Sequence, residues 1–171
     1  ISVKETKENF VVKPKSTAPI VELFRLTRNN LQAILDVPER KLICVTSTTT
    51  QEGKTFCSAN LALSFALAKK KTILVGLDIR RPQVRKYFSL STSRGIVTYL
   101  SGKETDLSSL IVPSGMSEYL DLLPAGPTPP NPNELLINSA LGDVFDYLRE
   151  RYDYIIVDTA PVGMVSDTFL I

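Results

Sequence analysis

The sequence predicts an α/β fold, a doubly wound and mostly parallel sheet with helices on both faces. Short apolar runs alternate with longer helical patterns, as strands alternate with helices in parallel sheets. Two of the runs, residues 72–78 and 154–158, are apolar at successive positions up to a final Asp, which is typical of strands covered on both faces. Polar or acidic residues follow three of the predicted strands, which is where such sheets bind ligands.

Length and composition indicate one globular domain. The chain has 171 residues, of which 43% are hydrophobic and 22% are charged, and this is enough for a sizeable core. The net charge of +2 argues against a dedicated nucleic-acid-binding protein, and the absence of histidine excludes most zinc sites. No apolar run is long enough to span a bilayer. Cys44 and Cys57 are expected to be small core residues in a reducing compartment.

The two ends of the chain suggest that it is a piece of something longer. It begins at Ile1 without a methionine, and it stops shortly after a predicted strand and loop, with no closing helix. We therefore expect a domain truncated at its C-terminal end. Residues 1–16 are polar and rich in Lys and Glu, which predicts a linker or flexible arm. Residues 17–171 are expected to form the domain.

The first predicted helix covers residues 17–35, with Pro19 at an early position where its missing N–H costs little. Apolar residues recur at helical spacing and are expected to face the core: Val21, Phe24, Leu31 and Leu35. A neighbouring stripe carries charged residues: Glu22, Arg25 and Arg28. Taken alone, this stripe is a solvated face with an intrahelical Glu–Arg pair.

Residues 46–55 lie between an apolar run, 42–45, and an Ala- and Leu-rich segment, 56–68, which predicts a strand, a polar loop and a helix. Gly53 allows the backbone to approach a phosphate closely, and the start of the helix favours negative charge. Lys54 would reach the β- and γ-phosphates, and the Thr55 hydroxyl would bind Mg²⁺. The predicted nucleotide-binding residues are Thr49, Thr50, Gln51, Glu52, Gly53, Lys54, Thr55 and Phe56.

One position departs from the phosphate-loop pattern, because Thr48 stands where the pattern asks for Gly. The tripeptide Gly-Lys-Thr alone is often an ordinary turn with a solvated lysine. The flanking strand and helix, and the two acids that end later strands, favour the phosphate site.

Later segments continue the alternation of strands and helices. Short helices are expected at residues 84–88 and 96–100, a short strand at 120–124 and a longer helix at 141–151. The Pro-rich segment 125–131 leads directly into a helix, so it predicts an ordered loop. That helix starts at Pro132, with a capping pair expected from Asn131 and Glu134.

Asp78 and Asp158 each follow a predicted buried strand. Asp158 would hold Mg²⁺ beside Thr55, although it could also be a loop or helix-capping acid. Asp78 could orient the metal's waters or accept a proton from an attacking hydroxyl, or it could pair with Arg80 or Arg81. The predicted metal-binding residues are Thr55, Asp78 and Asp158, and the predicted catalytic residues are Lys54, Asp78 and Asp158.

With these residues assembled, the chain from about residue 20 onward resembles the cytoplasmic kinase domain of bacterial protein-tyrosine kinases (BY-kinases) of capsule and exopolysaccharide synthesis. These are P-loop proteins related in fold to the MinD/ParA ATPases. Two resembling segments are specific to this family, an E-x-x-R-x-x-R helix at residues 22–28 and a Pro-rich loop at residues 124–132. Three more are similar to its Walker A (47–55), Walker A′ (74–82) and Walker B (155–161) motifs.

Three features differ from the family pattern. Thr50 and Gln51 stand where the family often has Pro-Gly. Gly76 stands in place of the first of two Walker A′ acids, so that only Asp78 remains of that pair. The family's acceptor tyrosines form a cluster at the far C-terminus, whereas the last tyrosine here, Tyr154, lies in a predicted core strand.

The resemblance implies an ATP- and Mg²⁺-dependent protein-tyrosine (auto)kinase that regulates exopolysaccharide or capsule synthesis and export. Glu22, Arg25 and Arg28 would pack subunits into a ring, and the acceptor tyrosines would come from the tail of a neighbouring subunit. The resemblance also implies a membrane chain-length regulator as partner, fused or separate, and no nucleic-acid partner. The implied location is the cytoplasmic face of the bacterial inner membrane.

Two other functions stay open. A MinD/ParA-type ATPase switch would hydrolyse ATP without transfer to tyrosine, which Gly76 and the missing tail favour. A nucleotide-bound assembly module would act through its ring state and not through turnover. The 22–28 helix and the Pro-rich loop favour the kinase over the switch.

Overall fold

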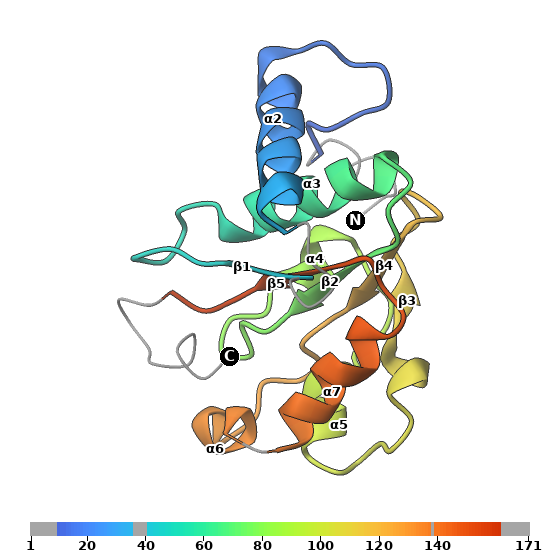
Figure 1. The fold of residues 1–171 in the computed structure, drawn as a ribbon. Coiled ribbons are helices and arrows are strands. Elements are labelled where there is room, and N and C mark those ends of the chain that lie inside the picture. Colours follow the sequence, from blue (N-terminus) through green and yellow to red (C-terminus); the bar gives the residue numbers. More distant parts are fainter. Residues whose placement is uncertain (1–9, 36–40, 138, 162–171) are drawn as a thin grey trace.

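The computed structural model describes residues 10–35, 41–137 and 139–161, which are built around a five-stranded sheet (Figure 1). In spatial order the strands are β1 (Leu42–Val45), β5 (Tyr154–Asp158), β2 (Thr72–Gly76), β4 (Leu120–Leu123) and β3 (Val112–Pro113). The first four are parallel, and β3 pairs antiparallel with β4. The predicted mostly parallel α/β sheet is confirmed, and the short antiparallel edge strand is an addition that the sequence pattern did not indicate.

Helices cover both faces of the sheet (Figure 1). On one face α3 (Lys54–Leu67) and α4 (Val84–Tyr87) pack on the strands, and α2 (Pro19–Ile34) packs on α3. The other face carries α5 (Ile96–Leu100), η1 (Leu107–Leu110), α6 (Pro132–Leu136) and α7 (Ala140–Arg149). None of the helices in the described ranges is long and apolar enough to cross a bilayer.

The core explains why the central strands are apolar at successive positions. All five residues of β2 are buried. Ile73 and Val75 belong to the apolar cluster beneath α5 and α7, whereas Leu74 belongs to the cluster beneath α3. Because side chains alternate between two buried faces, no solvent-facing position is left within the strand.

Strand β2 ends at Gly76, two residues earlier than predicted. The backbone amides of Leu77 and Asp78 both donate to the carbonyl oxygen of Asp158, at 2.8 and 3.0 Å. Since two donors share one acceptor, the regular ladder stops there. Asp78 therefore lies just past the edge of the sheet, in the turn that follows the strand.

The Pro-rich segment is ordered and leads into α6 with Pro132 in the first turn, as predicted. The capping detail is wrong, because the side chain of Asn131 makes no hydrogen bond to the helix backbone. Its Nδ2 donates instead to Oε2 of Glu134 at 3.1 Å. This side-chain bond takes both groups that the predicted capping box would have used.

The prediction that both cysteines are core residues is also wrong. Cys44 and Cys57 are exposed, with free thiols. Cys44 lies on β1, the edge strand of the described sheet, and its neighbours Ile43 and Val45 face the cluster beneath α3. Cys44 therefore faces the opposite side, which the described helices leave open at this edge. Cys57 lies in the first turn of α3, before the buried part of that helix begins.

The N-terminal segment packs on the domain from Phe10 onward. Phe10 and Val12 are buried, with 2% and 3% of their surface exposed. The amides of Val11 and Val12 donate to Oδ1 of Asn60 on α3, at 2.9 and 3.2 Å. These three residues are therefore part of the folded domain in this structure. The linker or flexible arm stays a prediction for residues 1–9, which lie outside the described residues.

Two glycines hold the start of α5 against the end of β4. The amide of Ile96 donates to the carbonyl of Pro124 at 2.9 Å. A Cβ atom on Gly95 would lie 2.0 Å from that same carbonyl oxygen and 2.5 Å from the amide nitrogen of Gly126. Both obstructing atoms belong to the backbone, so they cannot move aside as a flexible side chain would.

We expect Gly95→Ala to destabilise the protein by about 3 kcal/mol or more, since the β4 end must shift to admit a methyl group. Gly142→Ala is the matched control, because a Cβ there would meet no atom within 4 Å. It lies inside α7, where alanine is expected to stabilise by up to about 1 kcal/mol. Urea unfolding of both variants measures the two effects. Equal stability of the two variants would contradict this packing.

Candidate active site

The phosphate loop, Asp78 and Asp158 meet at the carboxyl edge of the sheet. Strand β5 lies between β1 and β2, and Asp158 pairs in register with Val45 on one side and Gly76 on the other. The loop that follows β1 and the turn that follows β2 therefore flank Asp158. The fold thus brings together the three strand ends that the sequence analysis singled out.

The phosphate loop enters α3 through residues in the left-handed region of the backbone. Gly53 is the N-cap of α3 at φ 86°, and Gln51 has φ 64°. A Cβ on Gly53 would meet no atom within 4 Å, so glycine is favoured here by backbone conformation and not by crowding. The free amides of the first α3 turn then lie at the loop, as in an anion-binding helix start.

Thr55 and Asp158 form the central contact of the site. The Thr55 hydroxyl donates to Oδ2 of Asp158 at 2.6 Å. Asp158 is only 2% exposed, and its other oxygen, Oδ1, has no hydrogen-bond partner within the described part of the chain. A buried carboxylate oxygen without a partner is costly, so a ligand that supplies positive charge would be favoured there.

This donor set fits Mg²⁺ bound together with a phosphate. Among the residues that the structure describes, no group of three His, Cys, Asp or Glu side chains could hold an ion alone. Mg²⁺ commonly takes one or two protein oxygens and completes its shell with phosphate oxygens and water. Thr55, Asp158 and the nearby Asp78 offer the hydroxyl and carboxylate oxygens that such a shell uses.

Burial governs the charge state of both acids. It raises the pKa of Asp158 to about 6, against the opposing effects of the Thr55 hydrogen bond and the Lys54 charge. Burial also raises the pKa of Asp78, against the hydrogen bond from the Arg81 backbone and the Lys54 charge. Lys54 therefore lies close enough to act on both carboxylates.

The sequence also allowed Asp78 to pair with Arg80 or Arg81, and part of that contact is present in the structure. Its Oδ1 accepts a hydrogen bond from the backbone N–H of Arg81 at 3.0 Å. The guanidinium of Arg80 bonds elsewhere, to Oδ1 of Asn133. Asp78 is thus held by its own turn, and its carboxylate remains half-exposed at the edge of the site.

An open cavity of about 520 Å³ follows this edge of the sheet. It contains six of the predicted nucleotide-binding residues together with Asp78, while Thr49 and Glu52 do not line it. The lining residues are Thr50, Gln51, Gly53, Lys54, Thr55, Phe56, Asp78, Arg81, Pro82 and Gln83.

Glu52 has a structural role that the sequence analysis missed. Its Oε2 accepts hydrogen bonds from the backbone amides of Thr48 and Thr49, at 2.9 and 3.1 Å. The bond from Thr49 is the main reason that the pKa of this carboxyl is lowered. Glu52 therefore shapes the phosphate loop from within. The available signal was Thr49-Thr50-Gln51-Glu52, which has the spacing of a capping box.

The residues predicted to assemble subunits lie on α2. Arg25 forms an ion pair with Glu22, and Arg28 donates from Nη1 to the carbonyl of Ser64 on α3 at 3.0 Å. Within the described chain neither arginine hydrogen-bonds to the phosphate loop. The intrahelical Glu–Arg pair is present, and Arg28 fixes α2 on α3 within one subunit.

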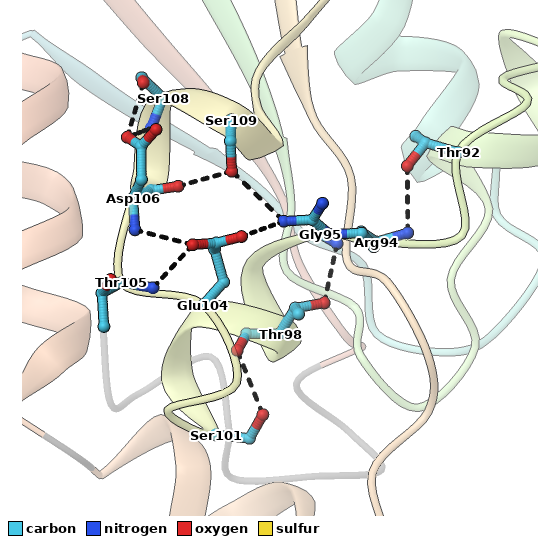
Figure 2. Close-up of polar contacts among 10 residues, drawn as sticks. All are labelled: Thr92, Arg94, Gly95, Thr98, Ser101, Glu104, Thr105, Asp106, Ser108 and Ser109. Atoms are coloured by element: carbon cyan, nitrogen blue, oxygen red, sulfur yellow. Dashed lines mark hydrogen bonds and ion pairs between the residues drawn. The ribbon is translucent and has the colours of Figure 1, made fainter.

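A larger cavity of about 700 Å³ lies at the Pro-rich loop and not at the sheet edge. Figure 2 shows the polar network beside it, in which Arg94 is ion-paired with Glu104. Oε1 of Glu104 accepts from the amides of Thr105 and Asp106, at 3.0 and 3.1 Å. The charge of Arg94 is therefore balanced within the chain. The grouping of lysine, hydroxyl and buried carboxylate occurs at the phosphate loop and not here.

Comparisons with known proteins show which families the chain is similar to. Residues 40–171 match the model of the AAA domain family. CapB of Staphylococcus aureus, named a putative tyrosine-protein kinase, is 37% identical over 155 residues, which cover 91% of this chain and 66% of CapB. The solved kinase domain of the Escherichia coli tyrosine kinase Etk has a TM-score of 0.88 at 31% identity, covering 94% of this chain and 62% of that one.

A third comparison concerns the fold alone. MinD of Pyrococcus horikoshii, solved with Mg-ADP, has a TM-score of 0.64 at 20% identity and covers 76% of this chain and 52% of that one. The chain thus spans about two thirds of the length of CapB and of the Etk kinase domain. The matching motifs, fold and identities place the chain in the AAA domain family, and within it the chain belongs to the bacterial tyrosine kinases (BY-kinases) with a MinD/ParA-like P-loop fold.

Proposed function

We propose that this protein is an ATP-dependent protein-tyrosine (auto)kinase that regulates exopolysaccharide or capsule synthesis and export. The observation that carries the proposal is the hydrogen-bonded pair of Thr55 and Asp158 at the end of the phosphate loop, in which the buried Oδ1 of Asp158 has no hydrogen-bond partner among the described residues. The names of the relatives CapB and Etk support tyrosine as the acceptor.

The residues have separate parts in the proposed transfer. The ATP phosphates lie on the 47–55 loop, where Lys54 neutralises the β- and γ-phosphates. Thr55 and Asp158 would hold Mg²⁺, which would supply positive charge to the phosphate oxygens when bound. Asp78 is half-exposed beside this pair and assists the tyrosine hydroxyl by accepting its hydrogen bond or its proton.

Ring assembly is part of the proposal, and the surface of α2 supports it. Ile20, Leu23 and Leu26 recur every third residue on this helix and are 41%, 58% and 57% exposed. Apolar side chains exposed in a row on one helix favour a protein–protein contact. The proposed partners are further copies of the chain, whose tails supply tyrosines, and a membrane chain-length regulator. The proposed location is the cytoplasmic face of the inner membrane.

The test is product analysis after incubation with Mg·ATP. Phosphotyrosine, detected by mass spectrometry, is the expected product. Free phosphate without phosphotyrosine would refute the proposal in favour of an ATPase switch. Tight nucleotide binding with neither product would favour an assembly module.

The ATPase switch is the second candidate, and Gly76 is the observation that favours it. Gly76 is buried and pairs in register with Asp158, where the family pattern has an acid. A Cβ at Gly76 would lie 3.2 Å from Cγ2 of Val84 and 3.3 Å from the amide nitrogen of Ala125. To admit a Cβ at this position, these neighbours need to shift by only a few tenths of an ångström.

We expect Gly76→Asp to raise the affinity for Mg²⁺ in the transfer reaction about tenfold, because it adds a carboxylate beside Asp158. Gly76→Asn is the matched control, since it has the same size without the charge. A Mg²⁺ titration of the transfer rate separates the two variants. If both give the same Mg²⁺ dependence, the position opposite Asp158 does not contribute to the metal site.

A further inference from the structure

The segment after Asp78 forms a second pocket beside the active-site cavity. Four of the seven residues 80–86 are Arg or Lys. The second pocket has a volume of about 390 Å³, and it shares the lining residue Pro82 with the active-site cavity. We call it the basic pocket, and its lining residues are Pro82, Arg85, Lys86, Ser89, Leu90 and Gly126.

The basic side of this pocket is held in place by the core. Val84 and Phe88 are buried, at 2% and 5% exposed, and they anchor the inner side of α4. Arg85 and Lys86 lie on the outer side and are exposed. Their carbonyls accept hydrogen bonds from the amides of Leu90 and Ser89, at 2.9 and 3.1 Å, so the backbone around them is fixed.

The charges of Arg85 and Lys86 are not balanced by an ion pair within the part of the chain that the structure describes. Across residues 10–35, 41–137 and 139–161 neither side chain has an acidic partner, whereas other exposed arginines do. Figure 2 shows the contrast at Arg94, whose guanidinium is paired with Glu104. Two cations on a fixed backbone beside an active site, without an acidic partner among the described residues, attract an anion.

We propose that the basic pocket binds an anionic group of the acceptor polypeptide, next to the tyrosine that enters the active site. This inference rests on the proposed tyrosine transfer, and it names the acceptor's chemistry. The anion can be a carboxylate of an acidic residue or the phosphate of a tyrosine that has already been modified. A guanidinium binds either group through paired hydrogen bonds, and the lysine adds a point charge.

Peptide binding without nucleotide tests this directly. Three fluorescent peptides share a central tyrosine and differ in their flanks, which are glutamines, glutamates or phosphotyrosines. We expect both anionic peptides to bind more tightly than the glutamine peptide, and increasing salt to weaken that preference. If the phosphotyrosine peptide binds more tightly than the glutamate peptide, phosphate is the preferred anion. If these two anionic peptides bind equally, the pocket recognises charge alone.

The variant that tests the pocket is Arg85→Gln with Lys86→Gln. It should weaken binding of both anionic peptides about tenfold and leave the glutamine peptide unchanged. The matched control is Lys69→Gln with Lys70→Gln, which removes the same charge at the opposite end of α3 from Lys54. In the transfer reaction, Arg85→Gln with Lys86→Gln should raise KM for anionic peptides without lowering kcat.

The outcomes separate the two proposals. Equal binding of the three peptides, or no effect of Arg85→Gln with Lys86→Gln, would overturn the assignment of the pocket while leaving tyrosine transfer untouched. The same variant can be tested on anionic phospholipid vesicles. If Arg85→Gln with Lys86→Gln lost vesicle binding while its peptide binding stayed unchanged, that result would also overturn the assignment. Selective binding of anionic peptides without any phosphotyrosine product would refute the transfer function and keep the pocket's preference for anions.

Discussion

Lys54→Met is expected to abolish phosphotyrosine formation, with a loss of about a thousandfold or more. Lys54 lines the active-site cavity, and its charge acts on both Asp78 and Asp158. Phosphoryl transfer depends mainly on positioning and on neutralising charge on the phosphates, so the loss of this cation removes a main part of the catalysis. Methionine keeps most of the side-chain length without the charge.

Lys70→Met is the control for Lys54→Met. Lys70 is exposed just past the carboxyl end of α3, so it undergoes the same substitution at the far end of the same helix. Its transfer rate should stay at the wild-type level. Thermal unfolding of both variants shows whether each is folded. A folded Lys54→Met protein that transfers phosphate at the wild-type rate would contradict the assignment of the phosphate loop.

Asp158→Asn is expected to have two opposite effects, loss of transfer and gain of stability in the nucleotide-free protein. The loss follows because the amide removes the charge that holds the metal beside Thr55. The gain follows because the wild-type carboxylate is buried with Oδ1 lacking a partner among the described residues. Asparagine keeps an oxygen that can accept the Thr55 hydrogen bond.

The sign of the stability effect follows from the raised pKa. Burial raises the pKa of Asp158 in the folded protein to about 6, above its ordinary value of 3.8. The protonated acid therefore stabilises the fold below about pH 4, and this stabilisation is lost as the pH rises through about 6. At pH 7.5, Asp158→Asn should stabilise the protein by on the order of 1–3 kcal/mol. The difference should shrink below pH 5, and a less stable variant at pH 7.5 would contradict the prediction.

Local patterns were enough to predict the parts of the site that lie within one segment. Gly53, Lys54 and Thr55 follow an apolar run and open a helix, so their place at a strand end could be read from adjacent residues. Asp158 closes a fully apolar strand, which is the pattern expected of a strand covered on both faces. The parallel order of the strands then put both features at one edge of the sheet.

Features that depend on distant contacts could not be predicted in this way. Phe10 lies in a polar, Lys-rich segment, and the contacts around it come from distant residues, since Oδ1 of Asn60 accepts hydrogen bonds from the next two amides. Cys44 has the neighbours of a core residue, but β1 is the edge strand of the described sheet, and strand order is not a local property. Arg28 binds Ser64 on α3, across thirty-six positions of the sequence.

The central claim is transfer to tyrosine, and the ratio of phosphotyrosine to ADP tests it most directly. The protein is incubated with Mg·ATP and a tyrosine-rich acceptor peptide, and both products are quantified in the same reaction, with Lys54→Met alongside. The kinase function predicts a ratio near one that disappears with Lys54→Met, because each ADP formed then corresponds to one modified tyrosine. ADP that accumulates without phosphotyrosine would contradict it.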